Sequence, residues 1–245
     1  MRDYTLSRLG GTCSILLAIS IIVVGITYLP LPPEQQQIVG LYTNPGAFLE
    51  SFAKNSTLLT VEFWAEALGA LFGIAAVLAI SESVRASNEG WVRWTSTLAI
   101  IGLAIAAIDD LRFLALMPGR AMAYVQSDAA TKAALTVPGI LEGIDPQHWL
   151  RLGAVGFWVL VVSFLALRSG TWPKLLAYVG IGAAIAYWLA VAGIVFQLPS
   201  VLTIIAGLGG IFLAPLWYIW LGLRLRQAGR ERIGASQSGL TTAPG

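Results

Sequence analysis

Two aspartates and an arginine follow one of the most apolar stretches of the chain. The segment "TSTLAIIGLAIA" runs into "AIDDLRF", which carries Asp109, Asp110 and Arg112. An ionised side chain deep in a bilayer costs at least about 2.5–3.5 kcal/mol on insertion scales, so such charges need partners or a ligand. Carboxylates can hold a proton, a cation or a guanidinium. These three residues are therefore the first candidates for a functional site.

Two glutamates form a second candidate group. The segment "VEFWAEALGALFG" places Glu62, Glu66, Gly69 and Gly73 at helical positions i, i+4, i+7 and i+11, which lie on one face. The G-x-x-x-G spacing lets two helices approach closely. We therefore predict that both glutamates point toward protein, and that Glu66 and Asp109 converge just beneath the outer boundary of the membrane.

A histidine and an arginine lie where another membrane helix is expected to begin. In "IDPQHWLRLG", Asp145 is the predicted N-cap, and His148 and Arg151 follow it. His148 is the only histidine and Cys13 the only cysteine, so no metal site built from these ligand types is expected. One histidine could supply a single axial ligand to a haem or a pigment, but no cofactor is predicted.

The predicted site residues carry more negative than positive charge. Four carboxylates face two arginines, which leaves two negative charges if every group is ionised. Protonation, a bound cation or contact with water would each relieve this excess. Four hypotheses stay open: ion pairs that only hold helices together, a pocket for a cation or small polar solute, a proton-linked step through Glu66 or an aspartate, and catalysis. The ligand-binding candidates are Glu62, Glu66, Asp109, Asp110, Arg112, His148 and Arg151.

The composition is typical of a membrane protein. Hydrophobic residues make up 57% of the chain and charged residues 11%, with a mean hydropathy of +0.76, whereas a soluble domain carries about 25% charged residues. The net charge is only +2 and the basic residues are scattered, so nucleic acid is not an expected partner. The sequence holds no phosphate-binding loop, zinc-protease or hydrolase motif. We therefore expect a non-enzymatic protein whose partner is the lipid bilayer.

Six segments are long and apolar enough to span a bilayer, which takes about 20 helical residues. With the N-terminus in the cytoplasm, ten of the fifteen Lys and Arg residues lie inside, so the positive-inside rule predicts both termini there. The predicted fold is an all-α bundle of six transmembrane helices over residues 1–226, with a disordered cytoplasmic tail over 227–245. The spans run approximately over 10–31, 58–81, 92–117, 149–167, 174–196 and 199–224.

The turn between the fourth and fifth predicted spans has a distinctive pattern, R-S-G-x-x-P-[KR]-x-L, which begins at Arg168 and includes Gly170 and Pro173. It is followed by "LPSV" and by a last span that ends "PLWYIWLGLRL". With these features the chain resembles a large group of bacterial six-helix membrane proteins known only as a domain of unknown function. The first half agrees mainly in architecture. The resemblance implies six spans and a bacterial inner membrane, and it implies no activity.

The sequence supports two hypotheses about function. The first is an outward-facing pocket of acids and arginines that binds a cation, a proton or a small polar solute for transport or sensing. The alternative is an accessory or scaffold subunit of a larger membrane complex, in which the glycine stripes and long outer loops contact other protein subunits.

Overall fold

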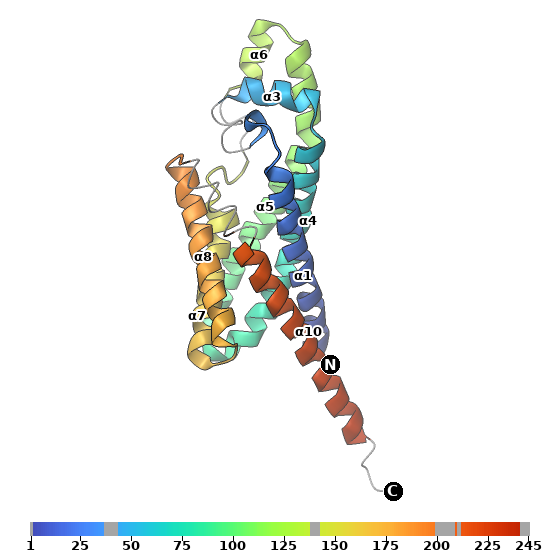
Figure 1. Cartoon of the computed structure of the whole chain (residues 1–245), viewed down its shortest axis with the longest axis vertical. Helices are drawn as coiled ribbons and strands as arrows, with labels where there is room; N and C mark the ends of the chain where they lie inside the picture. The colour runs from blue at the N-terminus through green and yellow to red at the C-terminus, as the bar shows by residue number, and fades with distance from the viewer. Residues whose placement is uncertain (1, 37–43, 138–142, 199–208, 210–211, 241–245) are drawn as a thin grey trace.

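The computed structural model describes residues 2–36, 44–137, 143–198, 209 and 212–240, and this part of the chain contains helices and no strand (Figure 1). Four of its helices are long and apolar enough to cross a membrane: Thr5–Tyr28, Thr57–Ser87, Trp149–Ser169 and Lys174–Val195. They overlap the first, second, fourth and fifth predicted spans. The chain is therefore an all-helical membrane protein. Most of the first half of the sixth predicted span, 199–224, lies outside the described residues.

The helices keep the chain order that the sequence predicts, with shorter elements between them. The main helices are α1 (Arg2–Tyr28), α3 (Pro45–Lys54), α4 (Thr57–Val84), α5 (Glu89–Gln126), α6 (Ala129–Leu135), α7 (Val155–Ser169), α8 (Lys174–Val195) and α10 (Ala214–Leu240). The short elements are η1 (Pro33–Gln35), η2 (Arg85–Ser87) and the π-helical turn η3 (Trp149–Ala154), which leads directly into α7.

Close contacts at glycines set the packing of α1, α4 and α10. A Cβ atom added to Gly10 would lie 2.0 Å from the Cβ of Ala79, and one added to Gly69 would lie 2.9 Å from the Cβ of Ser20. Gly11 lies in the same way against the backbone of Gly222 in α10. Gly69 is buried, so the prediction that this face of α4 points toward protein is confirmed. Small residues on this face let the helix backbones approach closely.

Helix α5 contacts helices from both halves of the chain. It packs against α4, η3 and α7. Its buried face includes Ala99, Leu103, Ala106 and Asp110. The helix covers the predicted third span and continues through Pro118 to Gln126, although we expected a connecting segment to begin at residue 118. The buried face also continues beyond this proline, where α3 packs against α5.

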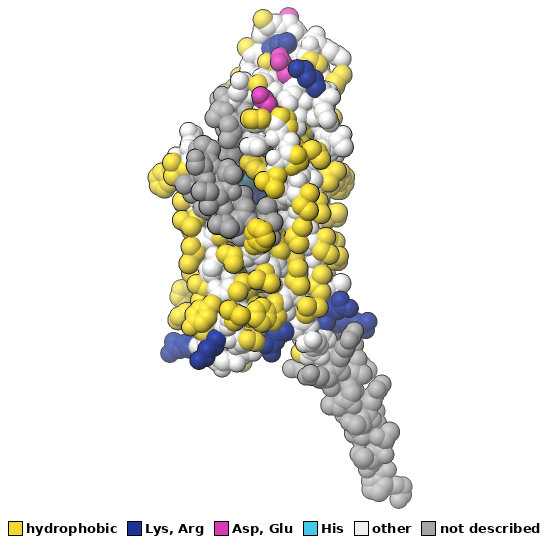
Figure 2. Space-filling view, in the orientation of Figure 1, with side chains coloured by type: hydrophobic (Ala, Val, Ile, Leu, Met, Phe, Trp, Pro, Cys, Tyr) yellow, Lys and Arg dark blue, Asp and Glu magenta, His cyan; other side chains and the backbone are white. Residues whose placement is uncertain are grey.

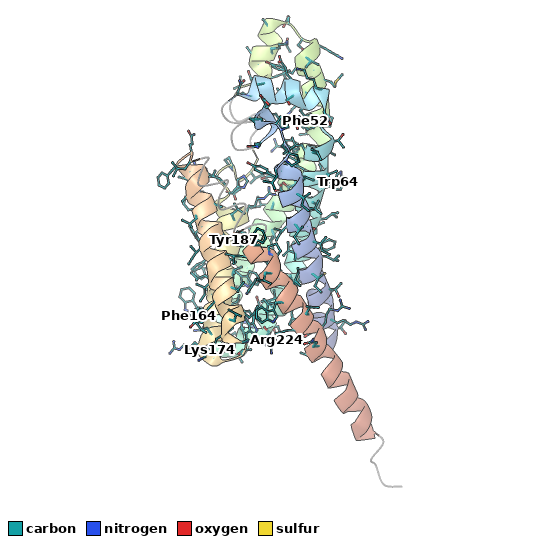
Figure 3. All side chains as sticks on the ribbon, in the orientation of Figure 1. Phe52, Trp64, Phe164, Lys174, Tyr187 and Arg224 are labelled. Carbon is teal, nitrogen blue, oxygen red and sulfur yellow. The ribbon has the colours of Figure 1, made fainter. Side chains whose placement is uncertain are left out.

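An aromatic cluster caps the end of the bundle where α3 lies (Figures 1 and 3). Phe63 of α4 and Phe113 of α5 stack with their ring centroids 3.6 Å apart. Phe48 and Phe52 of α3 each pack against the same Phe113 ring in a T-shaped arrangement. Such apolar rings hold α3 against the ends of α4 and α5.

A buried hydrogen-bonded group near the α4–α5 turn connects α4, α5 and α7. The indole Nε1 of Trp158 donates to the hydroxyl of Ser81 at 2.9 Å, and the hydroxyls of Ser81 and Ser96 lie 2.6 Å apart. All three side chains are buried. A buried polar group without a partner is costly, so this group also helps to fix which helix faces meet.

Tight turns return the chain at the opposite end of the bundle from α3. Gly170 follows α7 with a φ of 69°, a left-handed conformation that glycine adopts without strain, and Pro173 precedes α8. The distinctive turn pattern is thus a helix stop followed by a helix start. Basic side chains gather at this end of the molecule, where Lys174 and Arg224 are labelled (Figures 2 and 3). From here α10 continues to Leu240, through most of the segment predicted to be a disordered tail, 227–245.

Candidate functional site

Arg151 joins three helical elements through its guanidinium group. Its Nη1 and Nη2 donate to the two carboxylate oxygens of Asp110 at 2.8 and 3.0 Å, and Nη2 also donates to Oε2 of Glu66 at 2.6 Å. The Asp110 side chain is 1% exposed, that of Arg151 16% and that of Glu66 19%. Paired, charge-assisted hydrogen bonds of this kind are among the strongest in proteins. Arg151 therefore fixes η3 to α4 and α5.

Glu62 brings a third carboxyl group to this place. It lies one turn before Glu66 on the same face of α4, and it interacts electrostatically with Glu66, Asp110 and Arg151. Its side chain is 2% exposed, and its Oε2 has no hydrogen-bond partner among the described residues. We call Glu62, Glu66, Asp110 and Arg151 the buried charge cluster.

Tyr28 reaches the cluster from a fourth element. It is the last residue of α1 and interacts electrostatically with Glu62. The sequence gave no reason to single out this tyrosine, because an aromatic residue at the end of a membrane helix is common at the bilayer interface. Only the packing of α1 against α4 brings it near the carboxyl group.

The prediction that Asp109 is the partner acid from α5 was wrong. Its carboxylate instead accepts hydrogen bonds from the backbone amide of Ile144 at 2.9 and 3.0 Å, and a longer one from the amide of Asp145. Neighbouring residues on a helix are rotated by about 100°, so Asp109 and Asp110 face different surroundings. Acids from α4 and α5 do converge, but through Asp110.

Arg112 does not contribute to the cluster. Under the hypothesis of ion pairs that only hold helices together, Arg112 would pair with Asp109, three residues earlier. Instead, its side chain is exposed and forms no ion pair within the described part of the chain. Asp109 is already occupied by backbone amides that precede η3. The two arginines named from the sequence therefore differ: Arg151 is held by carboxylates and Arg112 is not.

Asp145 shapes the start of the helix that carries Arg151. Its carboxylate accepts hydrogen bonds from the amides of Trp149, Leu150 and Arg151 at 3.0, 2.7 and 2.8 Å. The predicted capping role is therefore present, although the helix begins at Trp149, later than expected. His148 lies between them as the N-cap residue, half-buried and with a left-handed φ of 58°. This turn directs the chain into η3.

The close approach of α5 to η3 depends on Gly102. A Cβ atom added there would lie 2.1 Å from the carbonyl oxygen of Leu150, which is backbone and cannot move aside alone. A glycine is required here because two backbones meet. This contact brings Arg151, the next residue, within reach of Asp110.

The cluster lies far along the bundle from the α4–α5 turn. Asp110 follows the first residue of α5 by 21 residues and Glu66 precedes the last residue of α4 by 18 residues, which correspond to about 32 and 27 Å of helix at about 1.5 Å per residue. The hydrocarbon core of a bilayer is about 30 Å thick. A bundle whose α4–α5 turn lies at one membrane surface would hold the cluster near the other.

The carboxyl groups of the buried charge cluster can take up a proton or pair with a cation. Glu66 and Asp110 share the single guanidinium of Arg151, and Glu62 adds a third carboxyl group. Across the described residues, no three His, Cys, Asp or Glu side chains are grouped so that they could hold a metal ion. Proton uptake and pairing with a cation on one or two carboxylates are the reactions that these side chains can perform.

Comparison with known proteins gives a match to one family model. No curated protein and no solved structure matches the chain. The family described as Domain of unknown function (DUF4386) matches residues 9–225, which include every residue of the buried charge cluster. The chain therefore belongs to the DUF4386 family.

Proposed function

We propose that this chain is a non-enzymatic protein of the bacterial inner membrane, with six spanning helices and both termini in the cytoplasm. Its buried charge cluster binds a cation, a proton or a small polar solute, for transport or sensing. The orientation is supported by the positive-inside rule, since the end of the bundle with the α7–α8 turn carries Lys174 and Arg224 (Figure 3). The cluster then lies toward the outer face.

One observation carries this proposal: the cluster holds more carboxyl groups than its arginine can neutralise. Two carboxylates already share Arg151, and Glu62 is buried beside them with an oxygen that no described residue contacts by a hydrogen bond. The guanidinium of Arg151 carries one positive charge and so offsets only one of these carboxylates when they are ionised. An excess of buried negative charge is stable only when a proton, a cation or a polar ligand offsets it.

The glycine stripes favour this proposal over the scaffold alternative. In the scaffold hypothesis, Gly69 and its neighbours would form a surface for other subunits. Instead, the site of a Cβ atom on Gly69 is filled by Ser20 and that on Gly73 by Leu103, both from the same chain. These glycines are therefore already used inside the bundle.

Melting temperatures of the purified protein in lipid nanodiscs test the proposal. The protein is heated across a range of pH values and with sodium, potassium or tetramethylammonium chloride, as wild type and as Glu66→Gln. We expect at least one of these cations, or a change in pH, to shift the melting temperature of the wild type, and Glu66→Gln to reduce that shift. The amide oxygen of Gln can still accept from Arg151, so the contact is kept while the charge is lost.

Glu82→Gln is the matched control, because Glu82 lies on the same helix but is exposed at its other end. A melting temperature that responds to neither pH nor any of the three cations would contradict the proposal. Equal responses in wild type and Glu66→Gln would contradict it too. Co-purification of stoichiometric partner subunits, together with that lack of response, would favour the scaffold role.

A further inference from the structure

The environment of Glu62 distinguishes it from the other acids in the buried charge cluster. Along α4 it is flanked by Leu59 and Phe63, which are buried and pack in one apolar cluster with Phe48 and Phe52 of α3. Glu66 and Asp110 both accept hydrogen bonds from Arg151, but none of the bonds that Arg151 donates goes to Glu62. Glu62 is thus in an apolar setting, beside charge that is already paired.

Within the described residues, four charged or titratable groups interact with Glu62. Glu66 lies on the same helix, Asp110 on α5, Arg151 on η3 and Tyr28 on α1. Glu66, Asp110 and Arg151 sum to one negative charge when all are ionised. An ionised Glu62 would raise this to two negative charges, with no further cation among the groups that face it.

A proton would offset this excess of negative charge better than a metal ion would. A buried carboxyl group is more stable when protonated if the nearest cation is already bonded to other carboxylates, because desolvation penalises the charged form. A metal ion would need several oxygen ligands around it, and the described residues offer no such group of three. A neutral carboxyl group also suits the position between Leu59 and Phe63.

We propose that the ligand of the buried charge cluster is a proton, held by Glu62 and exchanged with the aqueous phase at the end of the bundle where α1 ends. This inference rests on the proposed function and narrows its ligand to one. In the exchange, the carboxyl group of Glu62 gives its proton to water and becomes a carboxylate. The new negative charge attracts Arg151 and competes with Glu66 and Asp110 for it, so proton release weakens the attachment of η3 to α4 and α5.

Infrared difference spectroscopy across a pH titration tests this directly. The protein in lipid nanodiscs is compared as wild type, Glu62→Gln and Glu82→Gln. Above the pH range in which exposed Asp and Glu side chains titrate, we expect the carbonyl stretch of a protonated carboxyl group in wild type, its disappearance as the pH rises further, and its loss in Glu62→Gln. Glu82→Gln should retain it, because Glu82 is exposed and paired with Arg85. Absence of the band from wild type throughout that pH range would overturn the proposal, and so would its persistence there in Glu62→Gln.

A second measurement does not depend on the folding of any variant. A membrane-soluble carbodiimide adds across a protonated carboxyl group, with the oxygen bonding to the carbodiimide carbon and the proton moving to its nitrogen. Mass spectrometry of the labelled wild type should locate the adduct at Glu62, with less labelling at higher pH. No adduct at Glu62, or adducts at Glu66 or Asp110 alone, would overturn the inference. Stabilisation by sodium or potassium without a protonated Glu62 would leave the proposed function standing and refute this narrower one.

Discussion

Asp109 and Asp110 are adjacent in the chain, yet they hold different parts of the molecule. Asp110 accepts both of its hydrogen bonds from Arg151, within the buried charge cluster. Asp109 accepts from the backbone amide of Ile144 and so anchors the segment that precedes η3. Asp110 therefore holds the guanidinium of Arg151 in the cluster, whereas Asp109 holds the backbone that leads into η3.

This division predicts different consequences for two matched substitutions. Asp110→Asn should destabilise the protein by about 1.5–3 kcal/mol, because it weakens the charge-assisted hydrogen bonds from Arg151, which stays paired with Glu66. Asp109→Asn should instead raise hydrogen exchange at the amides of Ile144 and Asp145, while the cluster keeps its contacts. Thermal denaturation and hydrogen–deuterium exchange by mass spectrometry separate the two. Equal losses of stability in both variants would contradict the assignment.

Replacement of Arg151 by lysine should destabilise the protein. Arg151→Lys keeps the positive charge but loses the planar fork that bonds both oxygens of Asp110 and also reaches Glu66. Each hydrogen bond to a charged group contributes about 1.5–3 kcal/mol, so we expect a loss of that order in the free energy of unfolding. Arg112→Lys is the control, since Arg112 is exposed and should tolerate the change. Chemical or thermal denaturation of both variants, under identical conditions, measures the difference.

Gly102 and Gly119 give a paired test of the contact between α5 and η3. Gly102→Ala should be strongly destabilising, because the new Cβ would lie 2.1 Å from the carbonyl oxygen of Leu150. Gly119→Ala, on the same helix, meets nothing within 4 Å and should be neutral or stabilising by about 0.5–1 kcal/mol. Melting temperatures of the two variants provide the comparison. A harmless Gly102→Ala would mean that α5 and η3 are not in close contact.

Ser81→Ala should leave the buried indole of Trp158 without its acceptor. A buried donor that loses its partner costs about 1–3 kcal/mol, so the free energy of unfolding should fall by that amount. Ser83 provides the control, because its hydroxyl bonds only to a carbonyl oxygen of its own helix, that of Ile80. Ser83→Ala should therefore change stability little. Denaturation followed by tryptophan fluorescence measures both.

The cap of α6 should respond to pH in a known direction. The backbone amide of Thr131 donates to the carboxylate of Asp128 at 2.9 Å, which lowers the pKa of Asp128 below its ordinary value. A carboxyl group with a lowered pKa contributes stability above its pKa in the unfolded chain, and this contribution is lost as the pH falls through the folded pKa. Hydrogen exchange at Thr131 should therefore accelerate at strongly acidic pH. Asp128→Asn, which cannot ionise, should show no such acceleration beyond the intrinsic pH dependence of exchange.

The sequence alone determined the class of protein and much of its chain organisation. Long apolar runs need a bilayer, and their lengths and ends follow from local chemistry, as with Gly170 and Pro173 at the turn before α8. It also indicated that Glu62 and Glu66 face protein, because helical periodicity is local. Asp145 could be recognised as a cap for the same reason.

The tertiary structure decided which of the charged side chains meet. Helical spacing fixes the relative angles of Asp109, Asp110 and Arg112, but the rotation of α5 against its neighbours depends on packing at Gly102. That rotation turned Asp110 toward Arg151 and left Arg112 exposed. Tyr28 lies near Glu62 because α1 packs against α4, and no local sequence pattern encodes that contact. Periodicity within one helix is set by its own backbone, whereas the partners of a side chain depend on how separate helices pack against one another.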